Sequence, residues 1–135
     1  MIAADSTAIA RGVLNPRILK GKALEIACPK LDSNTQTYVE KLVGMIDQAK
    51  IDTLTVLIME VPCCGGLATI ATSARERAVR NIPIKVIILG VDGEVRSEEW
   101  VSLPTTCHIL RIVDFISRLN VRNHQRIKNK AADNL

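Results

Sequence analysis

The fold of this chain is decided by the stretch Leu54-Thr55-Val56-Leu57-Ile58-Met59, in which apolar and β-branched residues occupy nearly every position. A strand with this pattern is buried on both faces, as the central strands of parallel sheets are. The stretch leads into Glu60-Val61-Pro62-Cys63-Cys64-Gly65-Gly66, and a helical pattern follows over residues 66–80. The sequence therefore predicts a central strand over residues 53–60 that ends at two adjacent cysteines.

The same alternation of strand and helix extends outward from this strand. Similar strand patterns cover residues 22–28 and 85–89, and apolar side chains at helical spacing cover residues 34–50. The last strand runs into Asp92-Gly93, which is a strong turn signal. This β-α-β-α-β order predicts an α/β fold, with a small, mainly parallel sheet of three or four strands and flanking helices.

The two ends of the chain differ in pattern and charge. Residues 1–96 are predicted to form an α/β cysteine-containing domain, and residues 97–135 a loop, an amphipathic helix and a basic tail packed on the same domain. The apolar positions of that helix are Ile109, Ile112, Val113, Ile116 and Leu119. Residues 118–135 hold five basic side chains and one acidic side chain. The charge of this segment, +4, therefore equals the formal net charge of the whole chain. Because this basic tail carries no aromatic residues to stack bases, we expect no nucleic-acid partner.

Composition and length narrow the class of protein further. At 135 residues and 47% hydrophobic content, the chain is long enough to bury a core without stabilising disulfide bonds or metal ions. The first residues lack the pattern of a signal peptide, and no apolar run approaches the roughly 18 residues of a membrane helix. We therefore expect a cytoplasmic protein without a membrane partner. In a reducing cytosol, its cysteines are more often ligands or catalysts than disulfide bridges.

Three of the four cysteines follow predicted strands. Cys28 ends the strand over residues 22–28, and Cys63 and Cys64 follow the strand over residues 53–60. Consecutive parallel strands are often neighbours, about 4.8 Å apart, so these sulfurs are expected at one edge of the sheet. The helix that starts after Cys64 would favour thiolates there through its dipole, and Gly65-Gly66 would allow close backbone approach. The pattern predicts a metal or redox site, with buried structural cysteines as the alternative reading.

Several segments also resemble one group of proteins. The segments are Cys28-Pro29-Lys30-Leu31-Asp32, Tyr38-Val39-Glu40-Lys41-Leu42, Met59-Glu60-Val61-Pro62-Cys63-Cys64-Gly65-Gly66-Leu67, Ile82-Pro83 and Asp92-Gly93-Glu94. This pattern resembles the C-terminal domain of ferredoxin-like 4Fe-4S iron–sulfur proteins of anaerobic bacteria. In that family an N-terminal ferredoxin module carries cubane clusters. Because the first residues of this chain already resemble the start of the second domain, we expect it to lack the ferredoxin module.

The resemblance implies a set of ligands, from which this chain departs at one position. The family's second domain has a cysteine in an Ala-Asp-Cys segment, which reads Ala4-Asp5-Ser6 here. Cys28, Cys63 and Cys64 are then implied as ligands of an iron–sulfur cluster, with zinc as the alternative metal. Cys107-His108 is a further candidate for completing the set. An isolated chain without any bound cofactor also fits the sequence.

These observations lead to one leading function and two alternatives. We expect an accessory domain of an iron–sulfur electron-transfer protein, which works with a redox partner that carries ferredoxin-type clusters. The alternatives are a non-catalytic interaction domain with remnant cysteines, and a thiol-based oxidoreductase that uses Cys63 or Cys64. Self-association of the chain is compatible with the sequence. The sequence contains no phosphate-binding glycine loop of standard spacing, so it does not predict a nucleotide site.

Overall fold

A computed structural model of the chain describes residues 1–10 and 16–101. The predicted C-terminal helix, the basic tail and Cys107-His108 lie outside the described residues. Along the chain the elements are β1 (Ile2–Ala4), α1 (Asp5–Ala10), α2 (Pro16–Leu19), β2 (Glu25–Ala27), α3 (Thr35–Asp47), β3 (Leu54–Met59), the 3₁₀ turn η1 (Pro62–Cys64), α4 (Gly65–Arg77), β4 (Ile84–Leu89) and β5 (Val95–Val101).

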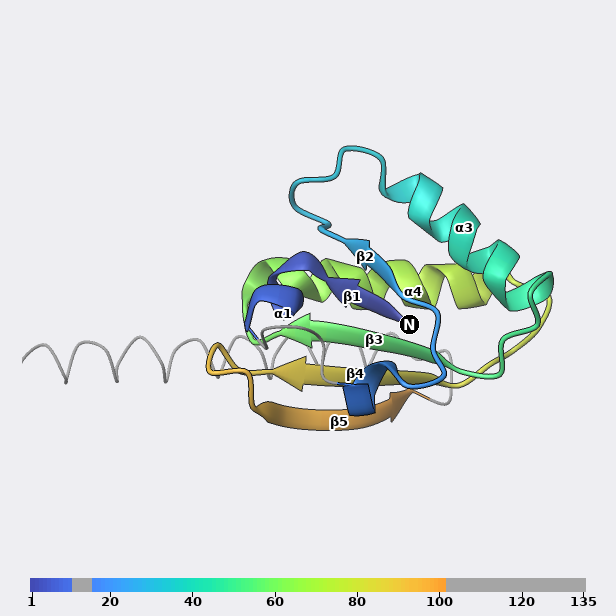
Figure 1. The fold of residues 1–135 in the computed structure, drawn as a ribbon. Helices are drawn as coiled ribbons and strands as arrows, with labels where there is room; N and C mark the ends of the chain where they lie inside the picture. The colour runs from blue at the N-terminus through green and yellow to red at the C-terminus, as the bar shows by residue number, and fades with distance from the viewer. Residues whose placement is uncertain (11–15, 102–135) are drawn as a thin grey trace, which may run out of the picture.

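These strands form a single mixed sheet. Within the described residues the sheet has five strands in the order β2-β1-β3-β4-β5 (Figure 1). The β2-β1, β1-β3 and β3-β4 pairs are parallel, and β5 runs antiparallel to β4. The predicted α/β class and mainly parallel sheet are confirmed. The predicted number of three or four strands was wrong, because β1 and β5 were not recognised.

The two additional strands lack the pattern that identifies a central strand. With only three residues, β1 is too short to show a period, although Ile2, Ala3 and Ala4 are all buried. Strand β5 lies at the sheet edge and is mostly exposed, so its sequence is largely polar. Strand β5 continues to Val101, so the sheet extends beyond residue 96, where the predicted cysteine-containing domain ends.

The position of β1 also corrects the expected neighbours. The strands that carry Cys28 and the Cys63-Cys64 pair, β2 and β3, are not adjacent, because β1 lies between them. Ala3 of β1 is in register with Ile26 of β2 on one side and with Leu57 of β3 on the other. The two strands are therefore two strand spacings apart, about 9–10 Å.

The larger part of the core lies between one sheet face and helices α3 and α4, which pack against each other (Figure 1). Its largest fully buried side chains include Leu42, Ile46, Leu54, Ile58, Leu67, Ile84 and Ile88. Burying each such side chain stabilises the fold by about 1.5–3 kcal/mol. On the opposite face, a smaller cluster of Ala3, Leu57, Ile87 and Leu89 packs against Ile18 and Leu19 of α2.

The two long helices agree with the predicted ones, and hydrogen bonds connect the end of α3 to the segment after α4. Helix α3 lies within the predicted residues 34–50, and α4 begins one residue before the predicted start. The carboxylate of Asp47 accepts hydrogen bonds from the backbone N–H groups of Val79 and Arg80, each at 3.0 Å. This carboxylate ties the segment after α4 to the end of α3.

None of the helices in residues 1–10 and 16–101 is long and apolar enough to cross a membrane.

The predicted Asp92-Gly93 turn is confirmed between β4 and β5. Gly93 has a φ of 80°, in the left-handed region that favours glycine, and its N–H donates to the Gly90 carbonyl at 2.9 Å. The Gly90 N–H donates to the carbonyl of Glu94 at 2.8 Å, which closes the hairpin.

Candidate functional site

The cysteine site lies where the direction of strand order reverses. From β1 the chain crosses outward to β2, and then returns past β1 to β3, so the carboxyl ends of β1 and β3 frame a topological switch point. Open α/β sheets bind their ligands in the crevice outside the strands at such a point. Ser6 follows β1 in the first turn of α1, and Cys63 and Cys64 follow β3 in η1.

Ser6 and Cys64 meet at this switch point. The Ser6 Oγ and Cys64 Sγ atoms are 3.6 Å apart, within the range of a hydrogen bond that involves sulfur. The residues are 58 positions apart in the chain, and only the parallel pairing of β1 with β3 brings them together. The resembled family has a cysteine at the position of Ser6. A sulfur at this position would therefore lie next to Cys64.

Cys64 is buried, and its surroundings favour the neutral thiol. Burial is the largest effect on its pKa and raises it above the ordinary value, and the adjacent Cys63 raises it further. Hydrogen bonds from the Met59 backbone and from Ser6 oppose this shift without reversing it. The start of α4 was expected to lower the pKa of this thiol; the pKa is raised instead, because desolvation of the thiolate is the largest effect on it.

Cys63 differs from its neighbour in exposure. Its side chain is exposed, whereas Cys64 retains only 4% of its accessible surface. The η1 turn produces this difference: the Cys64 N–H donates to the Val61 carbonyl at 3.1 Å, which turns successive side chains in different directions. One thiol of the pair can therefore meet a partner or reagent in solution, and the other faces inward toward Ser6.

The loop that carries Cys28 is held by Asp32. One carboxylate oxygen of Asp32 accepts the Cys28 backbone N–H at 2.7 Å and the Tyr38 hydroxyl at 3.0 Å. The N–H groups of Leu31 and Asp32 both donate to the Cys28 carbonyl, at 3.1 and 2.9 Å. The hydrogen bond to Asp32 is also the main reason why the pKa of Tyr38 is raised. Asp32 thus acts as a turn residue that fixes the backbone at Cys28.

The Cys28 loop lies directly over the start of α4. A Cβ atom added at Gly66 would be 3.0 Å from the Pro29 Cβ, which is tighter than ordinary contact, and 3.5 Å from its Cγ. Pro29 follows Cys28, and Gly66 lies two residues after Cys64. The absent side chain of Gly66 therefore allows the two cysteine-bearing segments to pack together at one edge, although β1 separates their strands.

The three cysteines share an edge without forming a metal site in this arrangement. Among residues 1–10 and 16–101, no group of three or more His, Cys, Asp or Glu side chains is placed so that it could hold a metal ion. The described cysteines are free thiols, one exposed, one intermediate and one buried. As described, the residues do not fit the coordination shell of a cluster or a zinc ion.

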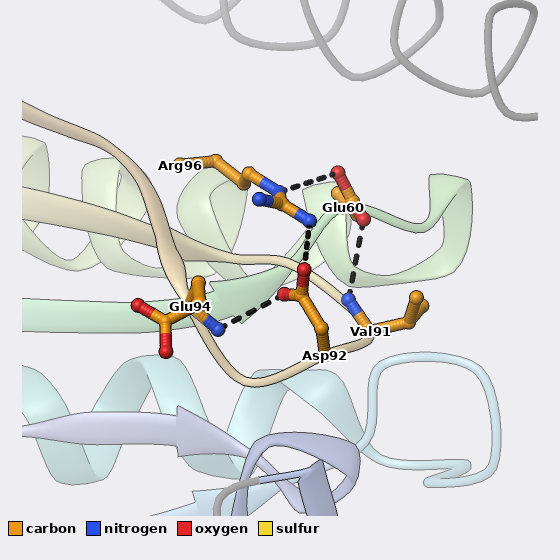
Figure 2. Close-up of polar contacts among 5 residues, drawn as sticks. All are labelled: Glu60, Val91, Asp92, Glu94 and Arg96. Carbon is orange, nitrogen blue, oxygen red and sulfur yellow. Dashed lines mark hydrogen bonds and ion pairs between the residues drawn. The ribbon is translucent and has the colours of Figure 1, made fainter.

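A buried carboxylate next to the cysteine turn was not recognised as a candidate from the sequence. Glu60 directly follows β3, and its side chain is only 3% exposed. Its Oε1 accepts the Val91 N–H at 3.2 Å, and its Oε2 lies 3.5 Å from the Arg96 Nε (Figure 2). The signal available in the sequence is an acidic residue at the end of an otherwise apolar strand, because such a residue is rarely buried without a partner.

Arg96 links Glu60 to the β4-β5 turn. Figure 2 shows its guanidinium between Glu60 and Asp92, with which it forms a second ion pair. The pKa of Asp92 is lowered, mainly by the hydrogen bond from the Glu94 N–H and then by Arg96. A Cβ atom at Gly90 would lie 2.5 Å from the Arg96 Nε, so an added side chain would displace the Arg96 guanidinium from this position. The network fastens the turn to the end of β3, three residues before Cys63.

The comparisons with known proteins agree with this architecture. The chain matches the family model described as a Rossmann-like domain over residues 1–132, and it belongs to this family. No curated protein and no solved structure gives a significant match. In this chain the residues after β1 read Asp5-Ser6-Thr7-Ala8-Ile9-Ala10, without the glycines of a dinucleotide-binding loop. Family membership therefore establishes the fold, and the chemistry depends on the residues at the switch point.

The contact between Gly66 and Pro29 leads to a prediction with a matched control. The Gly66→Ala variant should lower the free energy of unfolding by about 1 kcal/mol, because the Cys28 loop must move away from the added methyl group. Gly44→Ala should raise it by about 0.5–1 kcal/mol, since nothing lies within 4 Å of the added Cβ in the middle of α3. Urea unfolding of the two variants measures both values. A stabilised Gly66→Ala variant would contradict the close packing of the two segments.

The Glu60 network leads to a second prediction. Arg96→Met should lower the free energy of unfolding by about 1–3 kcal/mol, because a buried carboxylate loses a charged partner. Arg77→Met removes an exposed arginine from α4 and should change it by less than about 0.5 kcal/mol. Combining Arg96→Met with Glu60→Gln should recover part of the loss. Equal unfolding midpoints in urea for the two single arginine variants would show that Arg96 does not support Glu60.

Proposed function

We propose that this Rossmann-like chain is an accessory domain of a cytoplasmic iron–sulfur electron-transfer system, and that the edge carrying Cys28, Cys63 and Cys64 is its redox site. The observation that supports this proposal best is the 3.6 Å contact between Ser6 and Cys64. Of the four cysteine positions in the resembled family, two are in contact at the switch point. A third, Cys28, lies on the loop packed against Gly66.

The proposed partner is a protein with ferredoxin-type clusters that docks at this edge. The exposed Cys63 gives such a partner access. Asp32 holds the Cys28 loop on one side of this edge, and Glu60 holds the β4-β5 turn on the other side. Because the described cysteines form no metal-binding group, the clusters of the system are assigned to the partner. A cluster or zinc ion on the three cysteines of this chain stays a prediction.

The Ser6→Cys variant tests the site. It places a fourth sulfur beside Cys64, and the variant should retain several-fold more iron or zinc per chain than the wild type after anaerobic reconstitution. The physical reason is that metal ions select a set of thiolates over a set with one hydroxyl. Elemental analysis of the desalted protein measures the metal.

Two further variants serve as controls for Ser6→Cys. Ser6→Ala removes the hydroxyl without adding sulfur and should retain no more metal than the wild type. Adding Cys64→Ser to Ser6→Cys should abolish the gain, because Cys64 is the nearest sulfur. If Ser6→Cys retains no more metal than Ser6→Ala, the four positions do not form a metal site, and the resemblance to the family's set of cysteine ligands does not extend to metal binding.

A titration with a ferredoxin tests the partner. The isotope-labelled chain is observed by NMR while reduced ferredoxin, which carries paramagnetic cubane clusters, is added. We expect line broadening of the backbone amides of Cys28, Lys30, Leu31 and residues 63–67, because paramagnetic relaxation falls steeply with distance from the cluster. Residues 76–80, at the far end of α4, should be unaffected.

The same ferredoxin in its oxidised form, which keeps its clusters and its fold but is much less paramagnetic, is the control, and it should broaden these lines far less. Binding without local broadening would favour the non-catalytic interaction domain, since the contact would then lie far from the clusters. The absence of any binding would contradict this partner class altogether.

A further inference from the structure

A concave surface lies at the edge of the sheet opposite the cysteines, where the parallel strands begin. Here β3 begins at Leu54, whereas β1 begins at Ile2, which is in register with Val56. No β1 residue therefore pairs with the first two residues of β3, and a hollow remains beside them. It has a volume of about 540 Å³, within the range of small-molecule sites. We call it the amino-edge hollow. Its walls are formed by Met1, residues 21–23, Met45, residues 51–53, Thr55, Lys85, Ile87 and Trp100.

One wall of the amino-edge hollow is aromatic and cationic. Trp100 keeps 54% of its surface exposed, which is unusual for the largest apolar side chain. The Lys85 ammonium lies 5.6 Å from the centroid of its ring, at cation–π distance. Lys85 also pairs with Glu98 at 2.7 Å, which occupies one of its three N–H donors.

The remaining walls supply apolar surface, hydroxyl groups and a second cation. Met45, Ile51 and Ile87 give apolar contact, while Thr53 and Thr55 provide hydroxyls. Lys22 also lines the hollow, and its ammonium donates to the Ile18 carbonyl at 2.7 Å. The acidic lining residue, Asp52, has a side chain that is 97% exposed and lies 3.9 Å from Arg80, so its charge is turned to solvent and to that arginine.

We propose that the amino-edge hollow binds a small organic anion with a planar aromatic body. The ring would stack on Trp100 and contact Ile87, and the anionic group would receive hydrogen bonds from Lys85 and Lys22. Lys85, Lys22 and the N-terminal ammonium of Met1 are all carried by lining residues and favour an anion, and the exposed indole with its apolar neighbours favours a flat apolar body. This site lies at the other end of the strands from the cysteine edge, so it is independent of the proposed electron-transfer function.

The test uses 2-naphthoate and its neutral isostere 2-naphthamide. Trp100 is the single tryptophan of the chain, so its fluorescence reports on this hollow alone. We expect saturable quenching by 2-naphthoate with an affinity about tenfold or more above that of 2-naphthamide, because a charge-assisted hydrogen bond distinguishes the two ligands. Calorimetric titration of the same pair gives a second measure of both affinities.

Lysine variants locate the anionic group. Lys85→Met and Lys22→Met each keep an apolar stem and remove an ammonium, so each should bring the affinity for 2-naphthoate toward that for 2-naphthamide. Lys41→Met serves as the control, since Lys41 pairs with Glu25 outside the hollow, and it should bind 2-naphthoate like the wild type. Using two variants keeps the test valid if the loss of the Lys85-Glu98 pair disturbs folding.

Three results would overturn the proposal. Equal affinities for 2-naphthoate and 2-naphthamide would mean apolar adsorption without recognition of the anion. Wild-type affinity in both the Lys85→Met and the Lys22→Met variants would place the ligand elsewhere. The absence of any saturable change in Trp100 fluorescence, together with no heat of binding, would show that the hollow takes no ligand of this class.

Discussion

The parallel pairing of β1 with β2 on one side and with β3 on the other organises this fold. It places Ser6 beside Cys64, and it moves Cys28 one strand farther from the cysteine pair than the chain order implies. The Cys28 loop nevertheless reaches the segment that follows the cysteine pair, because Pro29 packs closely against Gly66 at the start of α4. Because Ile2–Ala4 is buried on both faces, any change in this short strand would act at once on the core and on the cysteine edge.

The cysteine pair shows how local and tertiary effects compete. A thiol at the start of a helix is expected to ionise readily, but Cys64 is buried deeply enough that desolvation decides its pKa. Cys63, one residue earlier, remains exposed. The two sulfurs therefore have different roles in any chemistry at this edge, with Cys63 available for contact and Cys64 for interactions inside the fold. The buried Glu60 and its partner Arg96 hold the neighbouring turn and add rigidity beside them.

Much of the fold and part of the site could be predicted from local pattern. The apolar stretch over β3, the helices α3 and α4, and the Asp92-Gly93 turn carry strong local signals, and the structure contains all of them. The convergence of Cys28 with the Cys63-Cys64 pair on one edge followed from the rule that parallel strands present their carboxyl ends together. By contrast, β1 and β5 were missed, because a three-residue strand and a polar edge strand have no period to detect.

Residue patterns within a few positions of one another were enough to predict the α/β class, the central strand and the placement of cysteines after strands. The tertiary structure alone decided that Ser6 meets Cys64, that the Cys64 thiol is stabilised in its neutral form, and that Glu60 pairs with Arg96. It also decided that Trp100 and Lys85 line a hollow at the amino edge. Each of these depends on strand order and burial, which join residues far apart in the chain and leave no periodic trace in its sequence.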